Sequence, residues 1–244
     1  MYFLLPRGYQ RNPQFVGRTE LLETLRNKLC QTQERTFNHR VALYGMGGVG
    51  KTQVALEYVF KYKSEYNSMF WITADSLANL QSRFQEIARV TQCVNTDEND
   101  AVSLARDVLT WLEKQISWLL VLDNVDNISI IYDYLPDVSA GNGNLLITSR
   151  DPNVTGIPAQ GLEVEVFKPQ TAAEMLLLHA NMTHKQDSET RSHAMTIVHE
   201  LGFLALAIEQ AAAFIRTSLR DISQFMAVYS ASREKFLRER PAQN

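Results

Sequence analysis

A glycine-rich segment near the start of the chain has the residue types that bind phosphate. Residues 45–52 read Gly-Met-Gly-Gly-Val-Gly-Lys-Thr, which fits the pattern of glycine, four residues, glycine, lysine and serine or threonine. Glycines let the backbone wrap tightly, so that successive amide groups can point at one anion. Lys51 would reach the β- and γ-phosphates of a nucleotide, and the Thr52 hydroxyl would bind magnesium. The segment therefore predicts a site for a nucleotide with Mg²⁺.

An aspartate that closes an apolar strand supplies the second magnesium ligand that such a loop needs. Asp123 follows the run Trp-Leu-Leu-Val-Leu at residues 118–122, and ligands of open α/β sheets bind at the carboxyl ends of the strands. We therefore expect Thr52 and Asp123 to hold the metal. Asn124 comes next, where a hydrolytic site often carries a second carboxylate, and an amide cannot take a proton from water. Weak ATPase activity at most is expected, with no residue assigned as the catalytic base.

An arginine ends another apolar strand at the same predicted edge of the sheet. Residues 145–149 read Leu-Leu-Ile-Thr-Ser and lead to Arg150, whose planar and permanently charged guanidinium suits a γ-phosphate. The alternative is that Arg150 pairs on the surface with its neighbour Asp151. Both interpretations are compatible with the sequence. In the first, Asp123, Asn124 and Arg150 lie together near the γ-phosphate.

These residues need a scaffold in which strands and helices alternate. Apolar runs predict strands, and apolar residues at helical spacing predict the helices between them. The strands are expected at residues 41–44, 69–73, 118–122, 145–148 and 162–167, and the helices begin near residues 19, 52, 76 and 102. Such alternation favours a mainly parallel sheet with helices on both faces. We therefore predict an α/β P-loop NTPase fold over residues 15–168, preceded by a linker at residues 1–14 whose part 6–14 is irregular.

The pattern of the sequence changes after Pro169, where no further strand is expected. Four helices are predicted, at residues 171–180, 189–201, 204–217 and 222–237. The third is apolar on nearly all sides, which is typical of a helix in the packed centre of a domain. Its alanine-rich faces also permit close helix approach, so a protein interface on part of this helix stays open as an alternative. Residues 169–244 are therefore predicted to form a small all-α helical domain.

Composition excludes several classes of partner. The 244 residues carry 24 lysines and arginines against 27 aspartates and glutamates, a net charge of -3. Domains that bind nucleic acid usually have a clear basic excess, so no direct contact with nucleic acid is expected. No run approaches the roughly 18 apolar residues of a membrane span, and two cysteines are too few for a disulfide framework. We expect a cytoplasmic protein with no membrane contact.

Several segments together resemble the NB-ARC ATPases, the nucleotide-operated switch modules of NOD-like receptors, cell-death adaptors and related STAND proteins. The matching segments are residues 15–18 with Glu20, 45–52, 119–123, 147–150 and 201–211, in the order seen in that family. Residues 15–18 and 207–211 look most like fungal or bacterial members. The resemblance covers nearly the whole chain from Phe15 onward. It implies ADP or ATP with Mg²⁺ as cofactors, and a role in signal transduction, innate immunity or programmed cell death.

The resemblance also implies which residues contact the nucleotide. Val16 and Arg18 would lie against the adenine or its ribose, and Arg150 would be the sensor arginine that reads the γ-phosphate. The segment 201–211 corresponds to a motif usually written Gly-Leu-Pro-Leu-Ala. Its proline position is Ala205 here, which removes a ring expected to pack on the nucleotide. The full set of expected nucleotide contacts comprises Phe15, Val16, Gly17, Arg18, Gly45, Met46, Gly47, Gly48, Val49, Gly50, Lys51, Thr52, Gln53, Arg150, Leu204 and Ala205.

The expected function is a nucleotide-binding switch that controls domain opening and oligomerisation. By resemblance, residues 169–244 are the first ARC-type subdomain. The family's winged-helix domain, with its Met-His-Asp motif, and the repeat domain beyond it are absent, so we expect an excised fragment of a protein that forms homo-oligomers when activated. Two alternatives stay open. One is a phosphoryl-transferring P-loop enzyme or active ATPase, and the other is a STAND-type transcription regulator.

Overall fold

The computed structural model describes residues 2–30, 39–94, 100–137, 139, 142–157, 159–182 and 187–238, with side chains up to residue 232. The chain divides into two compact units, Met1–Glu165 and Val166–Asn244. The polar, acidic composition of residues 95–100 predicts a loop, and of these residues only Asp100 is among those that the structure describes.

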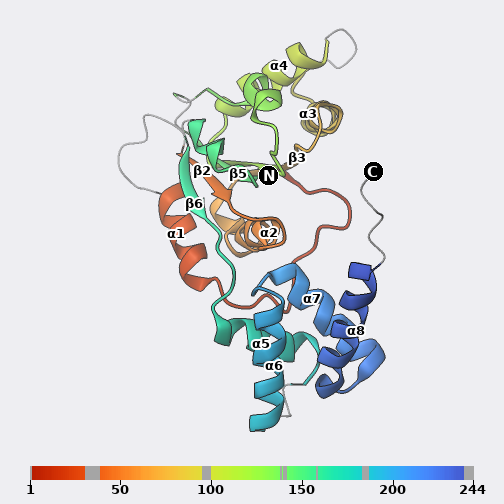
Figure 1. The fold of residues 1–244 in the computed structure, drawn as a ribbon. Helices are drawn as coiled ribbons and strands as arrows, with labels where there is room; N and C mark the ends of the chain where they lie inside the picture. Colours follow the sequence, from red (N-terminus) through yellow and green to blue (C-terminus); the bar gives the residue numbers. More distant parts are fainter. Residues whose placement is uncertain are drawn as a thin grey trace. The chain divides into compact units, whose positions relative to one another are not determined.

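The first unit is built on a six-stranded parallel sheet (Figure 1). The strands are β1 (Tyr2–Leu4), β2 (His39–Tyr44), β3 (Ser68–Thr73), β4 (Trp118–Asp123), β5 (Gly143–Ser149) and β6 (Gln160–Glu163). Their order across the sheet is β1-β3-β4-β5-β2-β6, and every neighbouring pair is parallel. The four central strands are buried along nearly their whole length, as expected for strands covered on both faces. The predicted α/β P-loop fold is confirmed.

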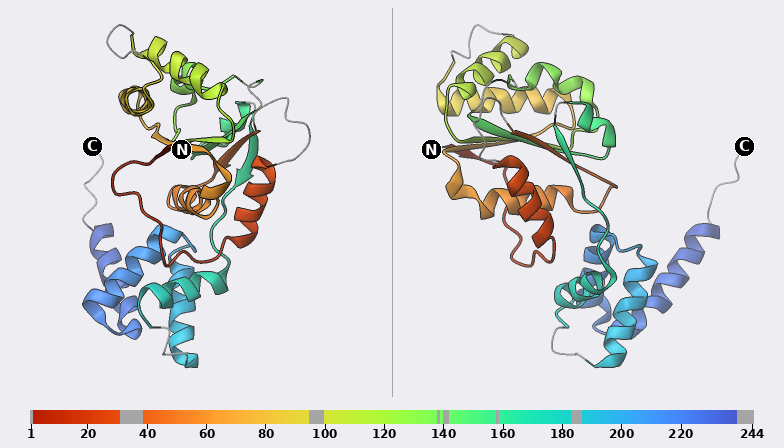
Figure 2. Two further views of the ribbon diagram at one scale, coloured as in Figure 1. Left: turned by 180° about the vertical axis from the view of Figure 1, so that it is seen from behind. Right: turned by 90° about the vertical axis from the view of Figure 1, so that its left-hand side faces the viewer.

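Helices cover both faces of this sheet (Figure 2). On one face lie α1 (Thr19–Leu29) and α2 (Lys51–Lys61), and on the other lie α3 (Leu77–Thr91) and α4 (Ala101–Glu113). Short 3-10 helices are η1 (Lys63–Glu65), η2 (Ile128–Tyr134) and η3 (Pro152–Gly156). The side chains of Ser76 and Asp100 cap α3 and α4 by accepting hydrogen bonds from amides of the first turn. Such caps satisfy amides that have no partner inside the helix, and they fix where each helix begins.

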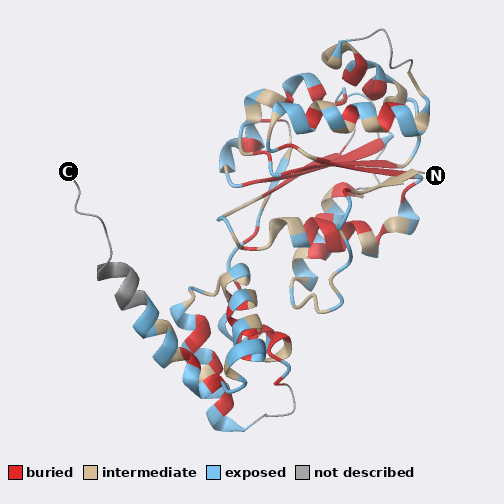
Figure 3. Ribbon diagram, turned by 90° about the vertical axis from the view of Figure 1, so that its right-hand side faces the viewer, coloured by how far each residue is buried: buried red, intermediate tan, exposed pale blue. Residues whose placement is uncertain are grey.

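The core of the first unit lies between the sheet and its helices (Figure 3). Trp118, Leu120 and Leu122 of β4 belong to the buried cluster that also contains residues of α3 and α4. A Cβ on Gly143 of the neighbouring β5 would lie 1.9 Å from the Trp118 ring. This position therefore needs glycine, because the indole occupies the space that any other side chain would take.

The first residues of the chain do not form a linker throughout. Tyr2–Leu4 form β1, which pairs with β3 at one edge of the sheet. The Tyr2 ring contacts Trp111 of α4 at a centroid distance of 6.0 Å. The prediction of a linker is therefore wrong for residues 2–4, because these three residues pair with β3, a strand far along the chain. Residues 6–14 contain no helix or strand, as predicted.

The last strand has other bounds than its apolar run suggests. β6 covers Gln160–Glu163, whereas the sequence predicts a strand at residues 162–167. β6 pairs with β2 only as far as Tyr44, where β2 ends and the glycine-rich segment begins. The predicted bounds are therefore wrong, because the register with β2 sets them and the hydropathy of the segment does not.

The described part of the second unit consists of helices. They are α5 (Pro169–His179), α6 (Ser188–Glu200), α7 (Ala205–Phe214), a π-helical turn η4 (Ile215–Leu219), η5 (Ile222–Gln224) and α8 (Phe225–Arg238). Pro169 begins α5, a position where its missing amide hydrogen costs nothing. Asp187 caps α6 by accepting a hydrogen bond from the Thr190 amide at 2.7 Å. The four predicted helices are confirmed, and the third is α-helical to Phe214 and continues as the π-helical turn η4 to Leu219.

α7 is less buried than its composition suggests. Ile208, Ala211 and Ala212 are buried, but Leu206 is 55% exposed and Phe214 is 39% exposed. The prediction of a helix in the packed centre of the unit is therefore confirmed for one face of α7 and wrong for the other, because a small helical unit covers only one face. Among the helices that the structure describes, none combines the length and apolarity that crossing a membrane requires.

Candidate functional site

The glycine-rich segment forms a loop between β2 and α2. β2 ends at Tyr44, and α2 begins at Lys51. Gly45 has a φ angle of 145°, and a Cβ there would lie 2.5 Å from the carbonyl oxygen of Val164. The chain therefore needs glycine where it leaves the strand. The loop leads directly into the N-terminus of α2, whose free amide groups and dipole attract anions.

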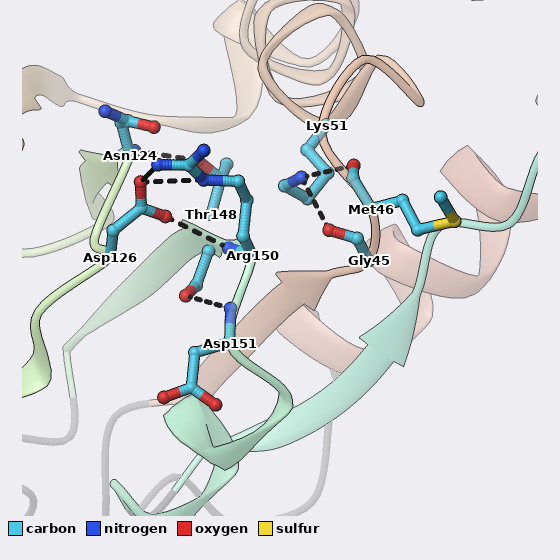
Figure 4. A network of polar contacts seen from close by, with 9 residues as sticks. Gly45, Met46, Lys51, Asn124, Asp126, Thr148, Arg150 and Asp151 are labelled. Carbon is cyan, nitrogen blue, oxygen red and sulfur yellow. Dashed lines mark hydrogen bonds and ion pairs between the residues drawn. The ribbon is translucent and has the colours of Figure 1, made fainter. Parts of the chain in front are cut away.

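Lys51 is held at this loop by neutral acceptors. Its Nζ donates hydrogen bonds to the carbonyl oxygens of Gly45 at 2.8 Å and Met46 at 2.9 Å (Figure 4). Burial lowers the pKa of the Lys51 ammonium, and the nearby Asp126 carboxylate opposes that shift. A phosphate oxygen would be a stronger partner than either carbonyl, since hydrogen bonds between two charged groups are about twice as strong as neutral ones. The lysine is thus placed to exchange its loop contacts for a phosphate.

Asp123 lies at the end of β4, where it is 2% exposed and accepts hydrogen bonds from two hydroxyl groups. Its Oδ1 accepts hydrogen bonds from the Thr52 hydroxyl of α2 at 2.8 Å and from the Thr148 hydroxyl of β5 at 2.6 Å. Thr148 Oγ1 in turn accepts a hydrogen bond from the Asn124 amide at 2.9 Å. Burial raises the pKa of Asp123, and the hydroxyl donors and Lys51 oppose that shift. Polar side chains from three separate elements therefore meet at the carboxyl end of the sheet.

The donors at this point suit a small divalent cation. Carboxylate and hydroxyl oxygens are hard ligands of the kind that Mg²⁺ takes, and this ion completes its coordination with waters and substrate phosphates. The oxygens of Thr52 and Asp123 already lie together. A buried carboxylate with mainly neutral partners is costly, and a cation would lower that cost. The two residues predicted to hold magnesium therefore fit that role.

Arg150 follows β5 and lies against the loop. A Cβ on Gly47 would come within 3.7 Å of Arg150 Cδ. The guanidinium pairs with Asp126, whose Oδ2 lies 2.8 Å from Nε (Figure 4). Asp151 instead caps η3 by accepting a hydrogen bond from the Asn153 amide at 2.8 Å. The alternative that pairs Arg150 with Asp151 is therefore wrong, because the acid that follows the neighbouring strand β4 lies closer to the guanidinium.

The segment before α1 reaches the loop through one arginine. Arg18 Nη2 donates hydrogen bonds to the carbonyl oxygens of Val49 in the loop, at 3.3 Å, and of Glu165, at 2.6 Å. Burial lowers the pKa of Arg18. Phe15 and Val16 precede it and are half-buried. Contact of these residues with adenine or ribose stays a prediction, and the structure adds that Arg18 ties the loop to the last residue of the first unit.

Some predicted nucleotide contacts lie outside this cluster. Gln53 is exposed on the first turn of α2, and Met46 is 65% exposed on the loop, where its contact with Lys51 is made by the carbonyl oxygen. Leu204 and Ala205 belong to the second unit, where Leu204 precedes α7 and Ala205 begins it. The structure therefore brings together the predicted residues around the loop of the first unit. A contribution of α7 to the nucleotide stays a prediction.

Tyr9 is a residue of this site that the sequence does not reveal. It lies in the irregular segment before α1, and its ring contacts Trp71 at a centroid distance of 5.4 Å. Burial raises the pKa of Tyr9, and the nearby Asp123 carboxylate adds to that shift. Nearby, Arg11 pairs with Glu57 of α2 through hydrogen bonds of 2.8 and 3.1 Å. A tyrosine in a turn-rich segment belongs to no motif and no periodic pattern, so only the fold could place it beside the aspartate.

Removal of the Tyr9 hydroxyl is expected to weaken the magnesium-dependent part of ATP binding. In Tyr9→Phe the ring still packs on Trp71, but the polar hydroxyl near Asp123 is lost, so a loss of about two- to fivefold is expected. Calorimetric titration with ATP, in Mg²⁺ and in a chelator, measures this difference. Tyr2→Phe is the matched control, because Tyr2 packs at the sheet edge on Trp111. An unchanged magnesium dependence in Tyr9→Phe would show that the hydroxyl is not part of the metal site.

The parallel sheet and the loop define a P-loop nucleotide-binding domain, here followed by a helical unit. Two solved structures share this fold. The Thermotoga maritima RuvB Holliday junction branch migration motor has a TM-score of 0.54 at 14% identity, covering 90% of this chain and 72% of that one. Drosophila ORC bound to DNA has a TM-score of 0.58 at 12% identity, covering 90% and 68%. At such identities the similarity shows the fold alone.

Sequence comparison defines the family. The NB-ARC domain family model matches residues 18–187, so the chain belongs to the NB-ARC family. A nucleotide-binding leucine-rich repeat (NLR)-like protein from Hyaloscypha variabilis is 31% identical over 252 residues, which cover 95% of this chain and 25% of that protein. The chain thus spans about a quarter of the length of this relative. The resemblance to NB-ARC proteins that the motifs predict is confirmed.

Proposed function

We propose that the chain is the adenine-nucleotide switch of a cytoplasmic, NLR-like signalling protein. It binds ADP or ATP with Mg²⁺ and hydrolyses ATP slowly at most. The observation that carries this proposal is the approach of Thr52 to Asp123, 2.8 Å apart, beside a glycine-rich loop that also holds Lys51. Membership of the NB-ARC family supports nucleotide binding.

Each group around the loop has a distinct role in this proposal. The loop amides and Lys51 bind the phosphates, because they present hydrogen-bond donors and positive charge at one point. Thr52 and Asp123 hold Mg²⁺, which would neutralise phosphate charge when bound. Asp123 is itself kept in place by the hydroxyl of Thr148. The chain thus supplies binding and orientation, and none of these groups is free to act as a base toward water.

A switch also needs contacts that distinguish ATP from ADP, since a ligand shifts an equilibrium only by its differential affinity for the two states. Arg150 is the group proposed for this task, because its permanently charged side chain lies against the loop. Arg18 is proposed to transmit a change at the loop to the end of the first unit, since it contacts both the loop and Glu165. In the whole protein, the nucleotide state would then control opening of the helical subdomain at residues 169–244 and assembly of homo-oligomers.

Nucleotide binding is tested by calorimetric titration of the chain with Mg·ADP and Mg·ATP. One nucleotide per chain is expected in each case, and the absence of binding by both would overturn the proposal.

The switch is tested by small-angle scattering of the ADP complex and of the complex with AMP-PNP, a nonhydrolysable ATP analogue. Different scattering curves are expected for wild type, and a smaller difference for Arg150→Ala. Identical curves in wild type would contradict a switch within this chain.

The proposal of slow hydrolysis makes Asn124 the position to change. Asn124 is exposed, follows Asp123 directly and has a φ angle of 64°, a conformation that aspartate also tolerates. Asn124→Asp would place a carboxylate beside the γ-phosphate, so we expect faster turnover with ADP affinity nearly unchanged. A multiple-turnover phosphate-release assay measures it. A wild-type rate already on the order of 1 per second would instead favour an active enzyme.

A further inference from the structure

Asp126 pairs with Arg150, whose side chain lies against the glycine-rich loop that also holds Lys51. Its Oδ2 accepts a hydrogen bond from Arg150 Nε at 2.8 Å and also forms the ion pair with Arg150 Nη2. Its Oδ1 accepts one from the Arg150 backbone amide at 3.3 Å. Figure 4 shows the carboxylate and the guanidinium side by side, with Lys51 turned to the loop carbonyls. Asp126 therefore binds Arg150 through both of its carboxylate oxygens.

The electrostatic surroundings place Asp126 near Lys51 as well. Arg150 lowers the pKa of Asp126, and both Asp126 and Asp123 favour the charged form of Lys51, with Asp126 the stronger influence. The Arg150 stem lies against Gly47 of the loop. A carboxylate thus supplies negative charge where an arginine and a lysine converge. The γ-phosphate of bound ATP would supply negative charge at the same place.

We propose that Asp126 competes with the γ-phosphate for Arg150 and thereby sets the preference between ADP and ATP. This inference rests on the proposed nucleotide site. With ADP bound, no γ-phosphate is present and the pair can persist. With ATP bound, Arg150 can contact the γ-phosphate only by leaving Asp126. The free energy needed to break the Asp126–Arg150 pair therefore offsets part of the attraction between Arg150 and ATP. This weakens ATP binding and leaves ADP binding less affected.

The exposure of the pair makes such an exchange feasible. The side chain of Asp126 is 28% exposed and that of Arg150 is 63% exposed. Ion pairs of this kind hold weakly in water, and salt screens them. A buried pair would be costly to break and would lock the site, whereas this one can open when a phosphate arrives. The competition is therefore expected to change affinities by a small factor.

The test compares Kd values for Mg·ADP and Mg·AMP-PNP, measured by calorimetry on the whole chain at low salt. In Asp126→Asn, the ratio of the ADP Kd to the AMP-PNP Kd is expected to rise about three- to fivefold. Asp151→Asn is the matched control, because it removes a charge of the same sign next to Arg150 but from an acid that does not pair with it. An unchanged or reduced ratio in Asp126→Asn would overturn the inference, and a reduced one would show that Asp126 positions Arg150 for ATP.

A double-variant cycle then identifies the mechanism. In the Arg150→Ala background, Asp126→Asn is expected to change the same ratio less than about twofold, because no guanidinium remains to be released. A full effect in that background would show direct repulsion between Asp126 and phosphate and would overturn the competition. Failure of the proposed function looks different, since wild type would then bind neither nucleotide.

Discussion

Lys51→Ala is expected to weaken the binding of both Mg·ADP and Mg·ATP at least tenfold. The Lys51 ammonium lies at the loop on the carbonyl oxygens of Gly45 and Met46, where a phosphate would replace these neutral partners. A hydrogen bond to a charged group is worth about 1.5–3 kcal/mol, which corresponds to a change in Kd of about ten- to a hundredfold. Calorimetric titration of the variant measures the loss.

Two controls make this result specific to the loop. Lys114→Ala removes an equal charge from an exposed position just after α4 and is expected to bind as wild type does. Thermal unfolding without nucleotide shows whether Lys51→Ala still folds after the loss of its two hydrogen bonds to the loop carbonyls. An unchanged affinity in a folded Lys51→Ala protein would remove the basis for assigning residues 45–52 to phosphate.

Asp123→Asn is expected to abolish most of the gain that Mg²⁺ gives to ATP binding. Wild type should bind ATP about tenfold or more tightly in Mg²⁺ than in a chelator, because the metal links the carboxylate to the phosphates. The new amide in Asp123→Asn carries no charge to attract the metal, although its oxygen can still accept hydrogen bonds from the hydroxyls of Thr52 and Thr148. Titrations in Mg²⁺ and in a chelator measure the two affinities. Asp133→Asn, at an exposed position of η2, is the control.

The same substitution should not destabilise the nucleotide-free protein at neutral pH. Burial raises the folded-state pKa of Asp123 above its unfolded value, so the folded protein holds a proton more tightly than the unfolded chain. Ionisation therefore costs stability, which falls as the pH rises from the unfolded pKa through the folded one. Asp123→Asn removes that cost. A melting temperature well below that of wild type would indicate a structural role for Asp123 in place of a metal site.

The residues that can be predicted from sequence are those whose role is set locally. The loop at residues 45–52 carries its backbone requirement in its own glycines, as Gly45 shows by its φ angle and its approach to Val164. Asp123 can be predicted because its strand is continuously apolar and the carboxyl ends of parallel strands meet at one edge. Neither prediction needs any knowledge of how distant segments pair.

The residues that cannot be predicted depend on register between distant segments. Asp126 follows β4 and Arg150 follows β5, so their pairing is decided by how these strands align and not by any local motif. Tyr9 lies near Asp123 in a segment that follows β1, and β1 is anchored at the sheet edge by its pairing with β3. In the same way, β6 ends where its partner β2 ends, although apolar residues continue beyond that point.

The measurement that tests the central claim most directly is the nucleotide that purifies with the chain. Denaturing the purified protein and separating the released small molecules by ion-pair chromatography identifies and quantifies it. We expect ADP or ATP from wild type in an amount approaching one per chain, and little or none from Lys51→Ala prepared in parallel. Wild-type protein that releases no adenine nucleotide and binds none when Mg·ADP or Mg·ATP is added would contradict the account.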